Sequence, residues 1–284
     1  MTPSHHYRFA VLALLLVTAN LSFGQKRPQD KFADFLKQQW LIGIDVGTNL
    51  TQPIVMERYS GILNTANNEV YDKDYQVFAN PGIQAGFYIT YYLKGLSIAV
   101  QPSFRRMQFG YETNYSWGDS PPNQLNYNYS IEQITDYFEI PLWFKYDILK
   151  KRFKPYVAIG VSQSLLMNAT KKVDLEREDF ATGTGIRTEE GTVFIGVDDS
   201  FQNGFTSLLG GAGVAYDTES NVRMVVEFTY RETIQNIINP NERYTENELT
   251  SVGDVYDDLR FRNIGLSIQF LFPLKYISSQ FKSF

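Results

Sequence analysis

The sequence predicts an all-β fold, an eight-stranded antiparallel transmembrane β-barrel with short periplasmic turns and long extracellular loops. Three observations predict it. Bulky apolar residues recur with a period of two in eight segments, which is the pattern of strands with one apolar face. Long connections alternate with short turns along the chain. Aromatic residues that suit strands and membrane interfaces are abundant, with 19 Tyr and 21 Phe in 284 residues.

The first 24 residues have the pattern of a secretion signal. Arg8 precedes an apolar run, Phe9–Ala19, and small residues follow, which predicts cleavage before Gln25. The run is too short to cross a bilayer as a helix, which takes about 20 residues. The segment 25–39 is expected to be periplasmic, either as a cap on the barrel mouth or as a linker.

The first four strands are predicted from apolar side chains at every second position. These are Ile42, Ile44 and Val46 in 40–50; Ile83, Ala85, Phe87, Ile89 and Tyr91 in 83–92; Leu96, Ile98 and Val100 in 96–106; and Phe138, Ile140, Leu142, Phe144 and Tyr146 in 137–148. The intervening positions are mostly small or polar, so the two faces of each strand meet different surroundings.

The second four strands repeat the pattern. Their apolar positions are Val157, Ile159 and Val161 in 155–166; a weaker set in 205–216; Val222, Met224, Val226, Phe228 and Tyr230 in 222–233; and Ile264, Leu266, Ile268, Phe270 and Phe272 in the last strand. An even number of strands places both termini at the end with the short turns, which is periplasmic in outer-membrane barrels.

We therefore expect a barrel over residues 40–272, followed by a tail, 273–284. It would lie in the outer membrane of a Gram-negative bacterium, with outer-membrane lipid around it. A soluble β-sandwich also shows period-two alternation, but it has no reason to sort its connections by length. Tyrosines near strand ends are expected to form the interfacial aromatic girdles. They are Tyr88, Tyr91, Tyr92, Tyr146, Tyr156 and Tyr230.

One stretch carries a family resemblance. Asp136–Met167 reads DYFEIPLWFKYDILKKRFKPYVAIGVSQSLLM. It resembles the characteristic stretch of the PorT-type outer-membrane β-barrel family, in which a strand with E-I-P-L and K-Y precedes a short basic turn and K-P-Y. Segments 96–104 and 210–217 are also similar, whereas the long third loop and the tail depart from the pattern. The resemblance implies a small barrel, mostly of undefined task, whose namesake is tied to export of cargo proteins by the type IX secretion system.

The barrel interior is predicted to be a paired polar core. Eight strands enclose a space that side chains just fill, so an open pore is not expected. Four acids and four bases fall on inward positions, and charges away from bulk water persist when they are paired. They are Asp45, Glu139, Asp147 and Glu227, with Arg105, Lys145, Arg223 and Arg231. A proton pathway or a gated conduit is the alternative interpretation of this set.

Composition argues against catalysis. The chain has no Cys, and its two His, His5 and His6, lie in the predicted signal, so general-base chemistry by His and thiolate metal sites are excluded from the mature protein. Glu139 and Glu227 remain as carboxylates, but each has bases nearby in the same lumen. We expect no enzyme, no cofactor and no metal site. The net charge of −5 also argues against a nucleic-acid partner.

The loops are the second candidate for function. Loop two, 111–130, is rich in aromatic residues that suit protein or glycan contact. They are Tyr111, Tyr115, Trp117, Tyr127 and Tyr129. The alternative is that these residues extend the barrel strands above the membrane. Loop three, 168–203, has eight acids against four bases, and loop four, 236–260, has six against two. Calcium binding by these loops stays open, although no EF-hand spacing occurs and solvated acidic loops explain the composition.

The leading hypothesis is a non-enzymatic outer-membrane barrel that acts through protein interaction, as an accessory to protein secretion with secretion-machinery proteins as partners. One alternative is a narrow gated transport conduit. The other is a structural or adhesive barrel that acts through its extracellular loops.

Overall fold

The computed structural model describes residues 38–59, 73–117, 125–149, 151–180, 187–218, 222–243 and 255–274. The predicted signal, nearly all of segment 25–39 and nearly all of the tail 273–284 lie outside the described residues. None of the helices among the described residues is long and apolar enough to span a membrane.

Eleven strands and two short 3₁₀ helices make up the described chain. The strands are β1 (Gln39–Glu57), β2 (Asp74–Tyr75), β3 (Pro81–Leu93), β4 (Leu96–Val100), β5 (Ser103–Trp117), β6 (Leu125–Asp147), β7 (Phe153–Asp179), β8 (Arg187–Gly196), β9 (Gly204–Asp217), β10 (Arg223–Thr233) and β11 (Asp258–Pro273), and the helices are η2 (Asp198–Ser200) and η3 (Pro240–Glu242). All of the strand pairings are antiparallel.

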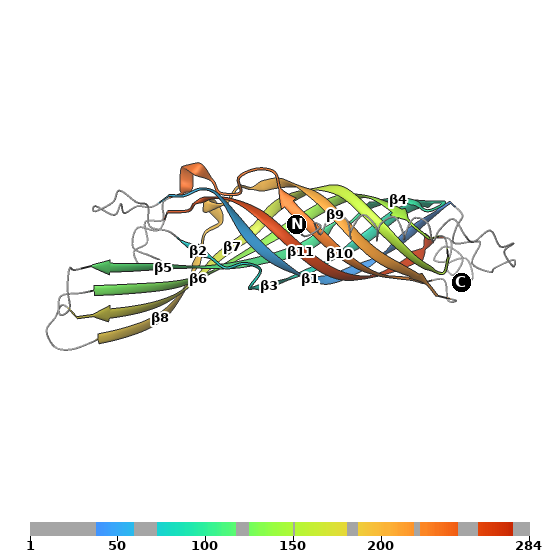
Figure 1. Ribbon diagram of the computed structural model, residues 1–284. Helices are drawn as coiled ribbons and strands as arrows, with labels where there is room; N and C mark the ends of the chain where they lie inside the picture. Colours follow the sequence, from blue (N-terminus) through green and yellow to red (C-terminus); the bar gives the residue numbers. More distant parts are fainter. Residues whose placement is uncertain are drawn as a thin grey trace, which may run out of the picture. The chain divides into compact units, whose positions relative to one another are not determined.

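The strands close into a ring of eight (Figure 1). Its order is β1, β3, β4 with β5, β6, β7, β9, β10 and β11, and β11 pairs back with β1. β4 and β5 count as one barrel strand, because both keep a single register with β3 and with β6 across the break at residues 101–102. A closed ring leaves no unpaired strand edge in the hydrocarbon, where backbone groups have no water to bond.

The eight predicted strands are confirmed, and several run further than predicted. β1 continues to Glu57, β6 has 23 residues and β7 has 27, more than a membrane crossing of about 9 to 11 residues requires. The two-residue turn at Lys94 and Gly95 joins β3 to β4, and both residues have positive φ, of 50° and 100°. Such φ values fit a tight hairpin turn, which keeps this end of the barrel compact.

Loops two and three are largely strand, contrary to their prediction as loops. Beyond the ring, β5, β6 and β7 continue side by side, and β8 pairs with the far part of β7 over Thr170–Asp179. We call these four segments, residues 106–117, 125–135, 170–179 and 187–196, the protruding sheet (Figure 1). The alternative interpretation of loop two, that its residues extend the barrel strands, is therefore the correct one.

The outside of the ring is apolar. The exposed fractions of Ile44, Phe87, Ile98, Phe144 and Phe228 are 48–68 %, and these residues belong to a wider band of exposed aliphatic and aromatic side chains. A band of this kind on a closed barrel is the lipid-facing surface of an outer-membrane protein. The prediction that these alternate apolar positions face outward is confirmed.

The predicted aromatic girdle was half wrong. Tyr146 and Tyr230 lie on the outer surface, and Tyr91 is partly exposed against the ring of Trp40, with 5.0 Å between the ring centroids. Three others point into the lumen and are at most 4 % exposed. They are Tyr88, Tyr92 and Tyr156. Side chains alternate between the two faces of a strand, and these three even-numbered residues share a face with lumen residues such as Gln84 and Lys154. This alternation, and not nearness to a strand end, determines where the tyrosines point.

Candidate functional site

The lumen carries its first cluster of charges at the periplasmic end, beside the short turns. Arg223 contacts Asp217 through Nε to Oδ1 at 2.6 Å and Nη2 to Oδ2 at 3.3 Å, and Lys154 pairs with the same carboxylate. The hydroxyl of Tyr92 donates to Asp147 at 2.8 Å, and the guanidinium of Arg223 lies 4.6 Å from the Tyr92 ring centroid. All five side chains are buried, so this end of the lumen is filled by side chains.

The second cluster gathers around Glu227. Its carboxylate accepts from the Lys145 ammonium and from the Tyr156 hydroxyl, and Gln269 donates to it at 3.3 Å. The Lys145 ammonium also lies 4.9 Å from the ring centroids of both Tyr88 and Tyr156. Aromatic faces stabilise a cation that has lost its water. The charge of Lys145 is thus compensated by one carboxylate and by aromatic rings.

The third cluster places two guanidinium groups on one carboxylate. Arg105 Nε lies 2.6 Å from Glu139 Oε2, and Arg231 Nε lies 3.2 Å from Glu139 Oε1. Arg105 also donates to Asn263 at 3.3 Å. Each of the three charged side chains is at most 4 % exposed. Arg105 donates a charge-assisted hydrogen bond to Glu139, which is stronger than a neutral one, whereas Arg231 contacts the same carboxylate as an ion pair without a hydrogen bond.

The structure brings the eight predicted lumen residues into one buried space. The four acids do not each pair with one of the four bases, however. Asp45 accepts from Gln84 at 3.3 Å and belongs to no ion pair among the described residues, and Asp147 bonds to a tyrosine. Arg223 instead pairs with Asp217, which the sequence reasoning missed together with Lys154. Both missed residues flank short turns. Each occupies a position that faces the lumen by the alternation of side chains along its strand, and this was the signal that would have found them.

A thick apolar layer closes the extracellular end of the lumen. It contains Phe109, Tyr137, Phe205 and Phe261, whose rings meet in edge contacts with centroids 4.9–6.1 Å apart. Segments that follow β8 and β10 pack onto the same layer. Its further buried members are Met107, Tyr111, Tyr129, Ile131, Ala169, Val173, Val197, Phe201, Ile237, Ile238, Tyr256 and Leu259. Between this layer and the periplasm, a lumen cavity of about 30 Å³ has room for only a few waters.

The predicted aromatic binding surface of loop two is divided by this packing. Tyr111 and Tyr129 are buried, at 1 % and 2 % exposure, so they belong to the apolar layer and not to an exposed surface. Tyr127 is partly exposed, stacks on Tyr129 with centroids 6.1 Å apart, and is covered by the Arg177 guanidinium at 5.5 Å. Tyr115 and Trp117 lie in β5, and their side chains fall outside the described residues.

The opposite face of the protruding sheet is polar and acidic. A hollow of about 390 Å³ there is lined by Glu112, Asn114, Asn128, Tyr129, Ser130, Asp174 and Glu176. Thr192 on β8 donates to Asp174 at 2.6 Å, and Lys172 lies 2.9 Å from the same carboxylate. These two hydrogen bonds, that from Thr192 first, lower the pKa of Asp174 below its ordinary value of 3.8. No group of three or more acids or histidines in the described chain has the geometry of a metal site.

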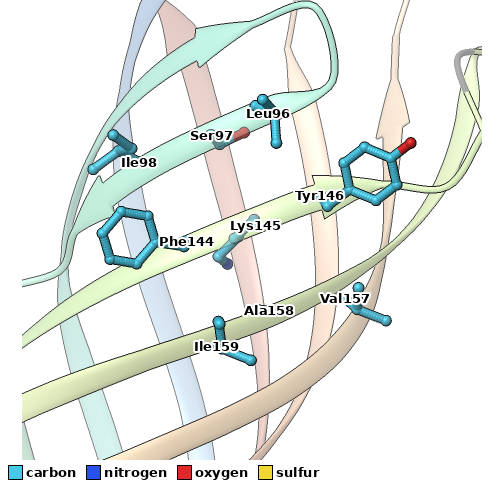
Figure 2. Close-up of a pocket in the computed structure, with 9 residues that line it drawn as sticks. All are labelled: Leu96, Ser97, Ile98, Phe144, Lys145, Tyr146, Val157, Ala158 and Ile159. Carbon is cyan, nitrogen blue, oxygen red and sulfur yellow. The ribbon is translucent and has the colours of Figure 1, made fainter.

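An apolar groove of about 370 Å³ lies on the outer surface of the ring across β4, β6 and β7 (Figure 2). Leu96, Ile98, Phe144, Tyr146, Val157 and Ile159 form its exposed wall. Ser97, Lys145 and Ala158 are buried at its floor because alternate residues of each strand point into the lumen. The groove faces lipid, so it offers nothing to a water-soluble substrate.

Residues 23–275 match the family model of the outer membrane protein beta-barrel domain. The chain belongs to this family. Its membership, the closed ring and the apolar outer band place the protein in the outer membrane.

Several solved outer-membrane proteins are similar to the chain at low sequence identity. They include the attachment invasion locus protein Ail of Yersinia pestis, at 12 % identity and a TM-score of 0.29, covering 82 % of this chain and 99 % of Ail. Neisserial surface protein A has 10 % identity and a TM-score of 0.31, covering 80 % and 95 %. The protease OmpT of Escherichia coli has 10 % identity and a TM-score of 0.29, covering 83 % and 97 %. No curated protein matches the chain.

Proposed function

We propose that this outer-membrane barrel is not an enzyme and acts through protein interaction at its surfaces. The observation that carries the proposal is a contrast between its inside and its outside. The lumen is occupied by ion pairs and by a packed apolar layer, whereas a four-stranded sheet extends beyond the ring. Loops and extensions held on a rigid scaffold are where binding surfaces concentrate.

The residue composition supports the non-enzymatic part of the proposal. The sequence has no Cys, and its two His precede the predicted cleavage site. The buried carboxylates of Glu139 and Glu227 each contact cations in the lumen. Such carboxylates are committed to charge compensation, which leaves them unsuited to hold and release a substrate proton.

The finer proposal is an accessory role in protein secretion, similar to that of the PorT-type namesake in type IX secretion. It rests on the resemblance of segment 136–167, which forms most of the β6 and β7 barrel strands and the short turn between them. Because that turn is periplasmic, secretion-machinery proteins would contact the periplasmic end of the barrel.

Mass spectrometry of proteins that co-purify with the full chain, tagged after Phe284, tests the proposal. The membranes are solubilised mildly, and a tagged unrelated eight-stranded barrel serves as the control. Enrichment of secretion-machinery subunits over the control supports the finer role, and enrichment of other proteins supports interaction without it. Recovery of no protein above the control contradicts the proposal.

A shortened variant separates the two ends of the barrel. Deleting residues 113–129 and 175–191 and joining the remaining strand ends by two-residue turns keeps the register, because Glu112 pairs with Ser130 and Asp174 pairs with Thr192. Partners that persist with this variant bind outside the deleted part, at the periplasmic end, on the ring or on the retained base of the protruding sheet, which includes residues 192–196 of β8. Partners that disappear bind the protruding sheet, which would favour the adhesive or structural role.

A further inference from the structure

The protruding sheet ends in a strand with a free edge. β8 is the last strand in the sheet order, and it pairs with β7 over all ten of its residues. On its other side, no strand of the described chain pairs with it. Figure 1 shows β8 as the outermost ribbon of the protruding sheet. An edge of this kind presents unpaired N–H and C=O groups in a row.

The register identifies which residues present those groups. The amide of Val197 donates to the carbonyl of Ala169 at 2.9 Å, and the two residues continue the β7 to β8 register. In an antiparallel pair, hydrogen-bonded residues alternate with residues whose backbone groups point the other way. Odd-numbered β8 residues therefore bond to β7. The even-numbered Thr192, Phe194 and Gly196 direct their N–H and C=O groups outward.

This edge lacks the usual protection against strand pairing. Edge strands are commonly blunted by charges, by Pro or by a bulge. Residues 191–196, GTVFIG, contain no charge and no Pro, and the β7 to β8 register runs without a shift. Phe194 on this edge is 65 % exposed. The strand is also held in place, since Thr192 donates to Asp174 across the pair.

We propose that the outward edge of β8 binds an extended, basic segment of a protein partner as a fifth strand of the protruding sheet. The proposal rests on the proposed function in protein interaction and specifies its binding mode. Strand addition takes its affinity from main-chain hydrogen bonds and its specificity from alternate side chains.

Charge determines the chemistry of the partner. Within residues 168–203, acids outnumber bases eight to four. Asp174 and Glu176 lie on the polar face of the sheet, and Glu190 is the register partner of Glu176 on β8 itself. Phe194 shares its face of the sheet with these acids, so basic residues at alternate positions of an added strand would extend along Phe194 toward the acids. The apolar residues of the added strand would then lie on the opposite face, that of Val193 and Ile195. A second copy of this chain would bring the same acids against one another, which is unfavourable.

Two substitutions at one position isolate the backbone contribution. Both Phe194→Ala and Phe194→Pro remove the ring, and only Pro also removes the outward N–H. Pro is tolerated on edge strands where the N–H faces solvent. The probe is a fluorescent ten-residue peptide that alternates Lys with Val, measured by anisotropy against the full chain in nanodiscs. A peptide with Glu in place of Lys is the charge control, and one with two central Pro residues is the strand control.

The proposal predicts that the Lys peptide binds both the wild-type chain and the Phe194→Ala variant. Its affinity for the Phe194→Pro variant should be at least about tenfold weaker than for Phe194→Ala, because the lost N–H removes main-chain hydrogen bonds. The Glu and Pro peptides should not bind. Equal affinity of the two variants, equal binding of the Glu peptide, or no binding of the Lys peptide to wild type would overturn it. Amide hydrogen exchange in β7 checks that Phe194→Pro keeps the sheet; if it does not, the Pro peptide alone decides between strand addition and another mode.

Two further readouts separate this inference from the proposed function. If co-purifying partners are retained by Phe194→Pro, interaction stands and the β8 edge is refuted as the site. If a dimer in sedimentation is lost with Phe194→Pro, the occupant is a second copy and the basic-partner assignment is wrong. If no partner co-purifies with wild type while the Lys peptide binds as predicted, the result supports the β8 edge as a binding site and contradicts the proposed function in protein interaction.

Discussion

Glu139 is the residue at which removing one charge should matter most for stability. Its carboxylate is 1 % exposed and compensates two buried guanidinium groups, those of Arg105 and Arg231. The substitution Glu139→Gln keeps the size of the side chain and one acceptor oxygen. It removes the negative charge and leaves two cations in the lumen around a neutral group.

The expected cost follows from this geometry. Removing one partner of a buried ion pair costs about 3–5 kcal/mol, because the remaining charge is left uncompensated. Gln still accepts one hydrogen bond, so the lower end, about 3 kcal/mol, is expected. With a urea m-value of about 1–3 kcal/mol per M, the unfolding midpoint should fall by roughly 1–3 M.

Urea unfolding of the barrel refolded into lipid vesicles measures this cost. Trp143 lies fully buried in the lumen, where it donates to Gln101 at 3.2 Å, so its fluorescence reports on opening of the ring. The matched control is Asp174→Asn on the protruding sheet, where Lys172 and Asp174 form an exposed pair. An exposed pair contributes about 0–1 kcal/mol, so the control should shift the midpoint little.

The double variant Arg105→Gln with Glu139→Gln tests the cause. If uncompensated charge is responsible, the double variant loses less than the sum of its two single variants. A Glu139→Gln midpoint within the error of wild type, or one no lower than that of Asp174→Asn, would refute the assignment of this cluster as a charge-compensated core.

Three other outcomes follow from the same structure. Phe228→Arg places a charge on the apolar band, where Phe228 is 51 % exposed, and should lower the free energy of unfolding by about 2–4 kcal/mol in the same assay. The control Ile234→Arg, beyond the end of β10, should lower it by only about 0–1 kcal/mol. Equal losses would contradict the lipid-facing assignment. Because folding lowers the pKa of Asp174, its contribution is present above the ordinary carboxyl pKa of 3.8 and is lost as pH falls through the lower folded value. The protection factors of the β8 amides, which correct for the slower intrinsic exchange in acid, should therefore fall as the pH falls, and unchanged protection factors would count against the Thr192 contact. Ala at Gly160 should slow assembly on heat-modifiability gels, since its Cβ would overlap the Leu142 backbone and press on the Trp143 ring, and wild-type assembly would show that the strands separate easily.

Most of the fold was accessible from the sequence, because a membrane barrel imposes one simple rule on each strand. Ile140 faces lipid and Glu139 faces the lumen since alternate residues point to opposite sides. The same rule places Tyr88 and Tyr92 inside, although both lie near a strand end. The alternation of side chains along a strand therefore predicts which way a tyrosine points better than its nearness to a strand end does.

Pairing inside the lumen and the length of the strands were less accessible. Strand register decides which base meets which acid, and a period of two does not fix register between distant strands. Asp217 and Arg223 meet because β9 and β10 pair across a short turn, whereas Asp45 is left with Gln84. The extension of the strands past the membrane was open as an alternative for loop two and was not predicted for loop three, because polar strands above the bilayer lack the lipid-facing apolar face.

Conductance in planar bilayers tests most directly the central claim, that this barrel works through its surfaces and not through its lumen. The purified full chain should give no reproducible single-channel events, because the ion-pair clusters and the apolar layer fill the lumen. Glu139→Gln and Arg223→Gln should be equally silent. Reproducible conductance in the wild-type chain that changes with either substitution would contradict the claim and favour a gated conduit.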